Sequence, residues 1–130
     1  EFIEVHPLFA SAFSREDPHA LARSRQAFSF IDDSGRVIAI IGAMETHAGV
    51  AYLWSFMSCS AGPHMLAIHR WTSRWIDTLG YRRIECTVLS GFKAAHRWMR
   101  MLGFKRETSR PMKKWDGVDD FHLYSKIARA

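Results

Sequence analysis

Residues 82–107, RRIECTVLSGFKAAHRWMRMLGFKRE, form the stretch whose pattern limits the fold most narrowly. Residues 83–89 predict a β-strand, and Ser90-Gly91 predicts a break after it. Beyond the break, apolar side chains recur at the spacing of one helix face: Ala95, Trp98, Met99 and Leu102. Gly103 followed by Phe104 is typical of a helix C-terminus. The stretch therefore predicts a strand, a short loop and a helix that ends in Gly-Phe.

The composition is that of a folded protein. The 130 residues are 48% hydrophobic and 24% charged, which predicts one domain over residues 1–130 and argues against disorder. No apolar run approaches the length of a membrane span, and the N-terminus lacks a signal-peptide layout, so we expect a cytoplasmic protein with no membrane partner. Because the sequence opens at Glu1 without a Met, we also expect a processed or cloned piece with a truncated first strand.

The charge and the cysteines restrict the partners. A net charge of +5 allows an acidic partner such as a phosphorylated ligand, a nucleic acid or an acidic protein surface. The basic residues are scattered along the sequence, however, which favours a solvated surface over nucleic-acid binding. Cys59 and Cys86 form no CxxC motif and have no histidine at metal-ligand spacing, which predicts free thiols in a reducing compartment and no metal site.

The first half of the chain predicts helices and then an antiparallel meander. Helices are expected over residues 7–13 and from Asp17-Pro18 onward. Strands follow over residues 28–31, 37–44 and 50–58, joined by turns over 32–35 and 47–49. The middle strand is almost continuously apolar, which predicts a central position buried on both faces.

A loop of small residues, 58–64, leads into a helix predicted over residues 64–79. Free N–H groups at a helix start suit an anion, although such a loop can equally be an ordinary connection. In this helix Trp71 and Trp75 share a face with Ile68 and Ile76, which favours core packing over a platform for stacked bases. A hairpin with strands over 105–115 and 121–127 is expected to complete the chain.

This order of elements, with the Leu102-Gly103-Phe104 ending, resembles the GNAT superfamily of N-acetyltransferases. It is similar in particular to short acetyltransferase-like proteins of tailed phages, whose last helix contains a segment like His-x-Arg-Trp-Leu-x-x-Leu-Gly-Phe. The match here is Arg97-Trp98-Met99 and Leu102-Gly103-Phe104, with His96 one place later than in that pattern. The resemblance implies a mixed α/β fold, with a central, mostly antiparallel twisted sheet, helices on both faces and a splayed parallel strand pair. It also implies the host cytoplasm, or association with the virion, as the location.

The resemblance implies acetyl-CoA as the acetyl donor, bound where the strand ending at Ser58 and the strand over residues 83–89 splay apart. Its pantetheine would pair with strand backbone, and its pyrophosphate would meet N–H groups at the start of the following helix. Six residues would form this cofactor site: Phe56, Met57 and Ser58 along the pantetheine, and Gly62, His64 and Met65 at the pyrophosphate.

Several positions depart from the family pattern. In the pyrophosphate loop, anchored on Gly62, the usual Arg or Gln is Cys59 and the usual second Gly or Ala is His64, while Pro63 removes one N–H donor. The tyrosine that can protonate the departing CoA thiolate is replaced by Met99, which has no proton to donate. The frequent Asn near the start of this helix corresponds to Phe92.

Acetyl transfer needs a base for the amine proton and a donor that polarises the thioester carbonyl. The candidate bases are Glu85, on the strand beside the expected cleft, and Glu45, at the end of a central strand. Cross-strand pairing with an arginine is the structural alternative for Glu85, and solvation is the alternative for Glu45. The carbonyl could be polarised by the backbone N–H of Met57 or of Ser58.

Two histidines are further candidates for phosphate contact. His64, at a helix start, can bond a phosphate or cap its own helix. His96 is expected on the basic side of the last helix with Lys93, Arg97 and Arg100, a cluster that suits the phosphates of CoA or of a nucleic acid, or simply a solvated helix face.

The sequence thus leads to an acyl-CoA-dependent N-acetyltransferase that moves an acetyl group from acetyl-CoA to an amine on a protein or small molecule. The alternative is a catalytically inactive GNAT-fold phage protein that serves in the virion or inhibits a host protein. A third hypothesis is a basic nucleic-acid-binding module.

Overall fold

The computed structural model describes residues 4–7 and 26–129. In chain order the elements are β1 (Glu4–Pro7), β2 (Gln26–Ile31), β3 (Val37–His47), β4 (Val50–Met57), the 3-10 helix η2 (Cys59–His64), α2 (Met65–Thr78), β5 (Arg83–Leu89), α3 (Lys93–Met101), β6 (Lys105–Arg106) and β7 (Phe121–Ile127). Of the helix predicted over residues 7–13, Pro7 belongs to strand β1 instead and the rest lies outside the described residues, as does the helix predicted from Asp17. Within the described chain, neither α2 nor α3 has the length and apolar character of a membrane-crossing helix.

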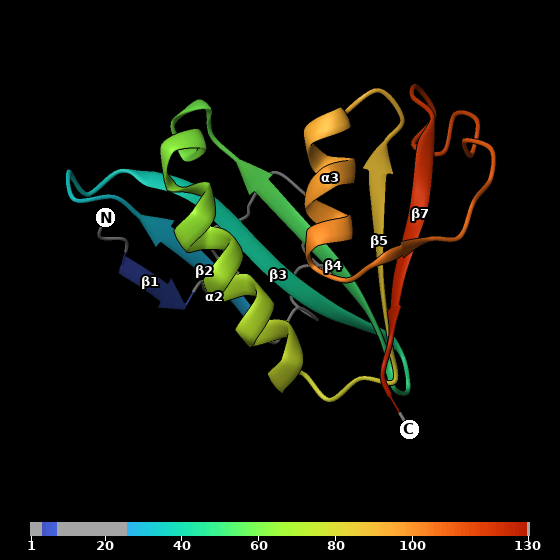
Figure 1. The fold of residues 1–130 in the computed structure, drawn as a ribbon, viewed down its shortest axis with the longest axis horizontal. Helices are drawn as coiled ribbons and strands as arrows, with labels where there is room; N and C mark the ends of the chain where they lie inside the picture. The colour runs from blue at the N-terminus through green and yellow to red at the C-terminus, as the bar shows by residue number, and fades with distance from the viewer. Residues whose placement is uncertain (1–3, 8–25, 130) are drawn as a thin grey trace.

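The strands form one twisted sheet in the order β1-β2-β3-β4-β5-β7-β6, shown in Figure 1. Neighbouring strands are antiparallel except for β4 and β5, which run parallel because α2 carries the chain back between them. The predicted class, a mixed α/β fold with a mostly antiparallel sheet and one splayed parallel pair, is therefore confirmed.

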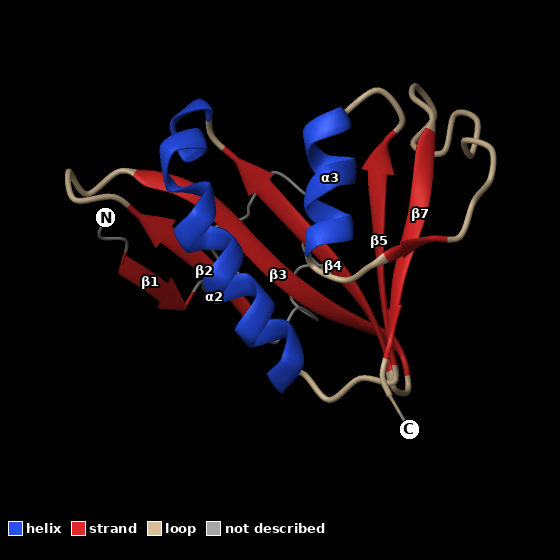
Figure 2. Ribbon diagram, viewed as in Figure 1, coloured by secondary structure: helices blue, strands red, loops and turns tan. Residues whose placement is uncertain are grey.

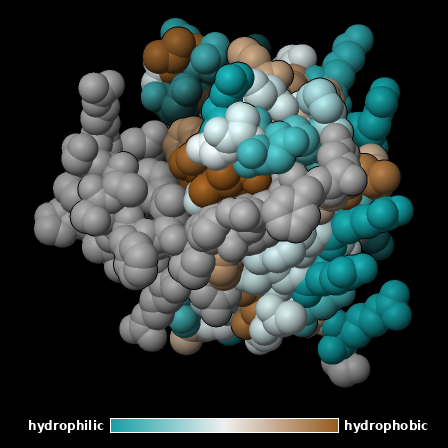
Figure 3. Space-filling model, turned by 90° about the vertical axis from the view of Figure 1, so that its left-hand side faces the viewer, coloured by the Kyte–Doolittle hydropathy of each residue, from teal (hydrophilic) through white to brown (hydrophobic). Residues whose placement is uncertain are grey.

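One face of the sheet carries both described helices, α2 over β2 to β4 and α3 beside β5 (Figure 2). Of the helices predicted on both faces, the described residues therefore show those of one face. Phe28 and Phe30 of β2 lie on this face and meet Trp71 of α2 edge-on, with ring centroids 4.9 and 5.2 Å apart. Trp71 stacks in turn on the buried Trp75. The predicted core role of the two tryptophans is confirmed. Hydrophilic side chains project from the outer side of the helices in the side view of Figure 3.

The Gly-Phe ending of α3 folds as a Schellman motif. The N–H of Phe104 donates to the carbonyl of Met99 at 2.9 Å, and the N–H of Gly103 donates to that of Arg100 at 3.0 Å. Gly103 has a φ of +89°, a backbone conformation that residues other than glycine adopt only with strain. Phe104 and Met99 are both buried in the core, so the motif fixes the direction in which the chain leaves the helix.

The predicted final hairpin is only partly formed. Its second strand, β7, is confirmed, but the first was expected over residues 105–115 and β6 covers Lys105–Arg106 alone. Pairing stops because the Thr108 hydroxyl accepts the N–H of Leu123 at 3.1 Å, in place of a backbone carbonyl. Pro111, which has no N–H, follows. A single bridge between Met112 and Phe121 is the remaining contact with the strand.

Candidate functional site

The parallel strands β4 and β5 share three rungs: Val50 with Arg83, Ala51 with Ile84, and Tyr52 with Glu85. Beyond the last rung they separate, because β4 stays paired to β3 as far as Met57 while β5 stays paired to β7 as far as Leu89. We call the gap between them the fork, with its vertex at Tyr52 and Glu85. Figure 1 shows that α2 and α3 both begin at the open end of the fork.

Backbone groups of β4 line one side of the fork. The N–H of Ser58 donates to the carbonyl of Ile38 across β3, at 2.9 Å. Because backbone groups alternate along an antiparallel strand, Phe56 also directs its groups toward β3, whereas Leu53, Ser55 and Met57 direct theirs into the fork. Of the two backbone N–H groups predicted to polarise the thioester carbonyl, that of Ser58 is therefore already bonded to Ile38, whereas that of Met57 is directed into the fork.

The predicted pyrophosphate cradle is short of free donors. Pro63 has no N–H, and the N–H of Met65 donates to the carbonyl of Gly62 within the turn from η2 into α2. Upstream, Ser58 is the N-cap of η2, where its hydroxyl accepts the N–H of Ser60 at 3.2 Å. His64 makes no side-chain cap to α2, so that alternative role is excluded. The 3-10 turn thus uses N–H groups that a phosphate would need.

On the helix side, a hydrogen bond joins α3 to α2 across the fork. The indole N–H of Trp98 donates to Nδ1 of His69 at 3.2 Å. Met99, at the position where the family resemblance expects a tyrosine, is 4% exposed within the core. Its thioether offers no proton to the fork.

On the opposite face, two hydroxyl groups meet at the vertex. Tyr52 Oη lies 2.5 Å from Thr87 Oγ1, so the pair bridges β4 and β5 just beyond their last shared rung. Burial raises the pKa of the Tyr52 hydroxyl, which keeps it protonated at neutral pH. Sequence reasoning missed this pair, although both residues lie on strands that were predicted to flank the cleft.

Glu85 lies at the vertex, opposite Tyr52 and on the same face of the sheet. On this face of β5, Glu85 is the neighbour of Thr87 on the side of the closed end. The Tyr52–Thr87 hydroxyl pair therefore lies between the Glu85 carboxylate and the open end of the fork. Arg83 Nη2 is 3.5 Å from Glu85 Oε2, so Glu85 pairs with an arginine of its own strand, whereas the alternative predicted a cross-strand arginine. Arg83 also binds Glu107, which follows β6 across the sheet. The hydrogen bond between Arg83 and Glu107 raises the pKa of Arg83 and lowers that of Glu107.

Glu45 lies away from the fork. It is exposed on β3 and pairs with Ala51, beyond the vertex toward the β3–β4 turn. Ala51 is on the face that the helices cover, whereas Glu85 is on the other. The structure therefore does not bring the two predicted bases together.

His96 is not on the basic side of α3, and that prediction is wrong. It is 9% exposed, and its Nε2 lies 3.1 and 2.9 Å from the carbonyl oxygens of Leu89 and Ser90. Since carbonyls only accept, Nε2 carries the proton, and Nδ1 accepts the hydroxyl of Tyr124 at 2.7 Å. Both ring nitrogens are occupied within the fold, so the predicted phosphate contact is not available to this ring.

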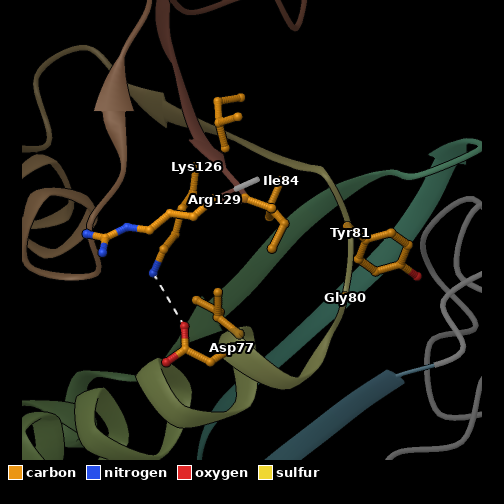
Figure 4. A pocket seen from close by; sticks show the side chains of 9 residues that line it. Asp77, Gly80, Tyr81, Ile84, Lys126 and Arg129 are labelled. Carbon is orange, nitrogen blue, oxygen red and sulfur yellow. Dashed lines mark ion pairs between the residues drawn. The ribbon is translucent and has the colours of Figure 1, made fainter.

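A hollow of about 420 Å³ lies at the closed end of the molecule, between the end of α2 and the ends of β5 and β7. In Figure 4 Asp77 and Lys126 face each other across it, 3.8 Å apart. Lys126 also donates to the carbonyl of Leu102 at 2.9 Å, which ties β7 to the end of α3. This hollow is remote from the open fork and supplies nothing to it.

The cysteines are both free thiols, as predicted. Burial raises the pKa of Cys86 to about 12, so this thiol is unreactive at neutral pH, while Cys59 is exposed in η2. Within the described part of the chain, no group of three or more potential metal-ligating side chains occurs.

Comparison with solved structures shows that the fold is that of the GNAT N-acetyltransferases. A putative phosphinothricin N-acetyltransferase superposes with a TM-score of 0.74 at 14% identity, over 99% of this chain and 100% of its own. The ribosomal-protein-S5-alanine acetyltransferase from Vibrio fischeri has a TM-score of 0.70 at 15% identity, with 98% and 93% covered. Mutant forms of the spermidine/spermine N-acetyltransferase from Vibrio cholerae reach 0.70 at 12% identity, with 97% and 95% covered.

By sequence alone, no protein-family model and no curated protein matches the chain. At these identities the structural likeness establishes the fold, and the chemistry rests on the residues of the fork.

Proposed function

We propose that this protein is a GNAT-type N-acetyltransferase that binds acetyl-CoA in the fork and transfers the acetyl group to an amine on a protein or small molecule. The observation that carries the proposal is the separation of β4 and β5 after three rungs. It leaves the backbone groups of Leu53, Ser55 and Met57 directed into the gap, where an extended amide-containing chain can pair with them.

In the proposed reaction, the nitrogen of a neutral amine attacks the thioester carbonyl. The N–C bond forms, the C–S bond breaks, the amine proton passes to a base and the CoA thiolate takes up a proton. Glu85 is the proposed base, acting through water or the Tyr52–Thr87 hydroxyls, because it is at the vertex and Glu45 is not. The N–H of Met57 is the proposed donor to the carbonyl.

The free thiols of Cys59 and Cys86 suit a reducing compartment, and we place the protein in the cytoplasm, that of a host cell if it is encoded by a phage. The structural neighbours are named for polyamine, protein and small-molecule acceptors, so the test uses one amine of each kind.

The decisive test is titration calorimetry with acetyl-CoA, followed by release of free CoA thiol in the presence of a polyamine, an N-terminal alanine peptide and an amino acid. We expect binding and release of thiol with at least one amine. Glu85→Gln should slow the release, whereas Glu45→Gln, its matched control, should not. Failure to bind at about 1 mM cofactor, a free energy weaker than about −4 kcal/mol, would exclude the proposal.

The competing candidate, an inactive GNAT-fold protein that acts in a virion or on a host protein, is favoured by one observation. The positions expected to hold the pyrophosphate and protonate the thiolate are occupied by Pro63 and by the buried Met99. Binding of acetyl-CoA without release of free CoA thiol in the presence of any of the three amines would favour this candidate.

A further inference from the structure

The positive charge of the protein is concentrated in one segment. Residues 93–114 contain eight Lys or Arg and a single acid, a net +7, whereas the whole chain carries +5, so the remaining residues carry a net −2. The single acid, Glu107, is already paired with Arg83. The scattered distribution expected from the sequence therefore does not hold for this segment.

Folding places four of these cations along one ridge. At 3.6 residues per turn, Lys93, Arg97 and Arg100 fall within an arc of about 60° on α3, and all three are exposed. The Schellman turn at Gly103 then reverses the chain and brings Arg106, which pairs with Tyr124 on the face of the sheet that α3 covers, beside Arg100. Lys105 pairs with Ser125, so its side chain is directed to the other face. We call Lys93, Arg97, Arg100 and Arg106 the basic ridge.

The lower end of the basic ridge is a hollow of about 350 Å³. Arg100, Lys105 and Arg106 line it together with the rings of Phe104 and Tyr124, and no acidic residue lines it. The Tyr124 hydroxyl donates to His96, so it is turned away from any ligand in this hollow. The hollow thus combines two cations of the basic ridge with an aromatic floor.

Within the described part of the chain, none of the four cations of the basic ridge forms an ion pair. The ion pairs among the described residues join Arg83 to Glu85 and Glu107, and Lys126 to Asp77. The mutual repulsion of neighbouring uncompensated charges disfavours the compact state, and a bound anion relieves it.

The basic ridge is separate from the fork. Trp98, which faces α2, and Arg100 are about 200° apart around α3, so the ridge is on the side of the helix turned toward β6 and β7. A cofactor in the fork would not reach it.

From this arrangement we propose that the basic ridge binds the phosphate backbone of a single-stranded nucleic acid. The distance from Lys93 to Arg100 is about 10 Å along the helix, which exceeds one phosphate group and suits several in a row. Guanidinium groups match phosphate oxygens in geometry. Within α3, Met101 is the one large apolar side chain that is exposed, too little for the apolar centre of a protein–protein interface.

The test is fluorescence anisotropy of a labelled oligothymidylate at several salt concentrations between about 50 and 200 mM. Contact with four phosphates gives a slope of log K against log salt of about −2.8, at about −0.7 per contact for single strands. The variant Arg97→Gln, Arg100→Gln, Arg106→Gln should reduce the slope by about 2 and weaken binding at least tenfold at low salt.

The matched control is Arg36→Gln, Arg70→Gln, Arg74→Gln, which removes the same charge from exposed positions outside the ridge. It should leave the slope nearly unchanged. Equal losses in the two variants, no binding at low salt, or displacement of the oligonucleotide by poly-glutamate as readily as by unlabelled oligonucleotide would each overturn the proposal. Far-ultraviolet circular dichroism checks that both variants fold.

Discussion

Tyr52 and Thr87 are the residues whose positions bear most directly on the proposed acetyl transfer. The sequence directed attention to Met99, where a proton donor is missing, but it did not show that another hydroxyl stands at the vertex. Their contact depends on which rung is the last that β4 and β5 share, and strand register across a crossover cannot be derived from local pattern.

We predict that Tyr52→Phe lowers kcat for acetyl transfer by about 100-fold, the usual size of a lost proton donor, with little change in the Kd for acetyl-CoA. The reason is that the Tyr52 hydroxyl, kept protonated by burial, is the group nearest the vertex that can donate to the thiolate. Stopped-flow measurement of thiol release gives kcat, and calorimetry gives Kd. Thr87→Val, which keeps the phenol, should cost less, and a kcat for Tyr52→Phe within about twofold of wild type would rule out the role.

Thr72 presents an opposite case, a polar group that the fold does not use. It is fully buried on α2, and its hydroxyl has no hydrogen-bond partner among the described residues. Thr72→Val keeps the shape and removes the unsatisfied group, so we predict a gain of about 1 kcal/mol in the free energy of unfolding by urea.

The control for this gain is Thr78→Val. The Thr78 hydroxyl donates to the carbonyl of Trp75 at 2.6 Å, so its removal should destabilise by about 0.5–1 kcal/mol. A loss of stability in Thr72→Val would show that its hydroxyl is satisfied in solution.

His96 shows why the candidate site was only partly predictable at this scale. In the segment Lys93–Met101 a histidine at the border between the apolar and basic sides can turn either way. What decided its direction is the pair of carbonyls at the end of β5 and the hydroxyl of β7, all brought in by tertiary structure.

At the scale of elements, periodicity and turn residues predicted the strands β2 to β5 and both described helices nearly to their ends. The exception is the first arm of the final hairpin, which was expected over residues 105–115 but pairs only over Lys105–Arg106. Its ladder ends because the Thr108 hydroxyl takes the N–H of Leu123 and Pro111 has no N–H to offer. Local pattern reports what a segment can form, and it contains no information on whether a partner is in reach.

Gly103 allows a direct test of the element that decided the fold. We predict that Gly103→Ala costs about 1 kcal/mol and lowers Tm by about 4 °C, since an alanine there must hold a left-handed backbone and its methyl group would meet the Lys126 side chain at 3.4 Å. Differential scanning calorimetry measures the change.

Gly91→Ala is the appropriate comparison. Gly91 precedes α3, has no positive φ, and has nothing within 4 Å of the added methyl group. It should leave Tm within about 1 °C, and an equal fall in the two variants would mean that the Schellman turn is not the cause.

For the whole molecule, the clearest pH dependence involves Glu107. Its pKa is lowered in the folded state by the hydrogen bond from Arg83, so it stabilises the fold above its usual pKa of 4.5, and this stabilisation is lost as the pH falls through the lowered value. Because the pair is partly exposed, we expect wild type to exceed Glu107→Gln by only about 0.5 kcal/mol at pH 7, with no difference near pH 2.

Urea unfolding at the two pH values tests this expectation. Glu45→Gln, which removes an exposed carboxylate from outside the ion pairs of the described residues, is the control. The same difference between wild type and Glu107→Gln at both pH values would show that the carboxylate does not act through its charge.

The three shared rungs have a mechanical consequence. They divide the described chain into two lobes, β1 to β4 with α2 and β5 to β7 with α3, and the backbone crosses between the lobes once, through residues 79–82. The softest deformation of such a body is a scissoring of the lobes about the vertex. Toward the open end it is opposed by two side-chain bonds, Tyr52 to Thr87 on one face and Trp98 to His69 on the other, while the Asp77–Lys126 ion pair joins the lobes at the closed end. Cutting the first two bonds with Tyr52→Phe and Trp98→Phe should widen this motion. The amide of Ala51, which faces β5 within the three rungs, should then exchange with deuterium faster than in wild type, whereas the amide of Ile41, within the undivided part of the sheet, should exchange at an unchanged rate.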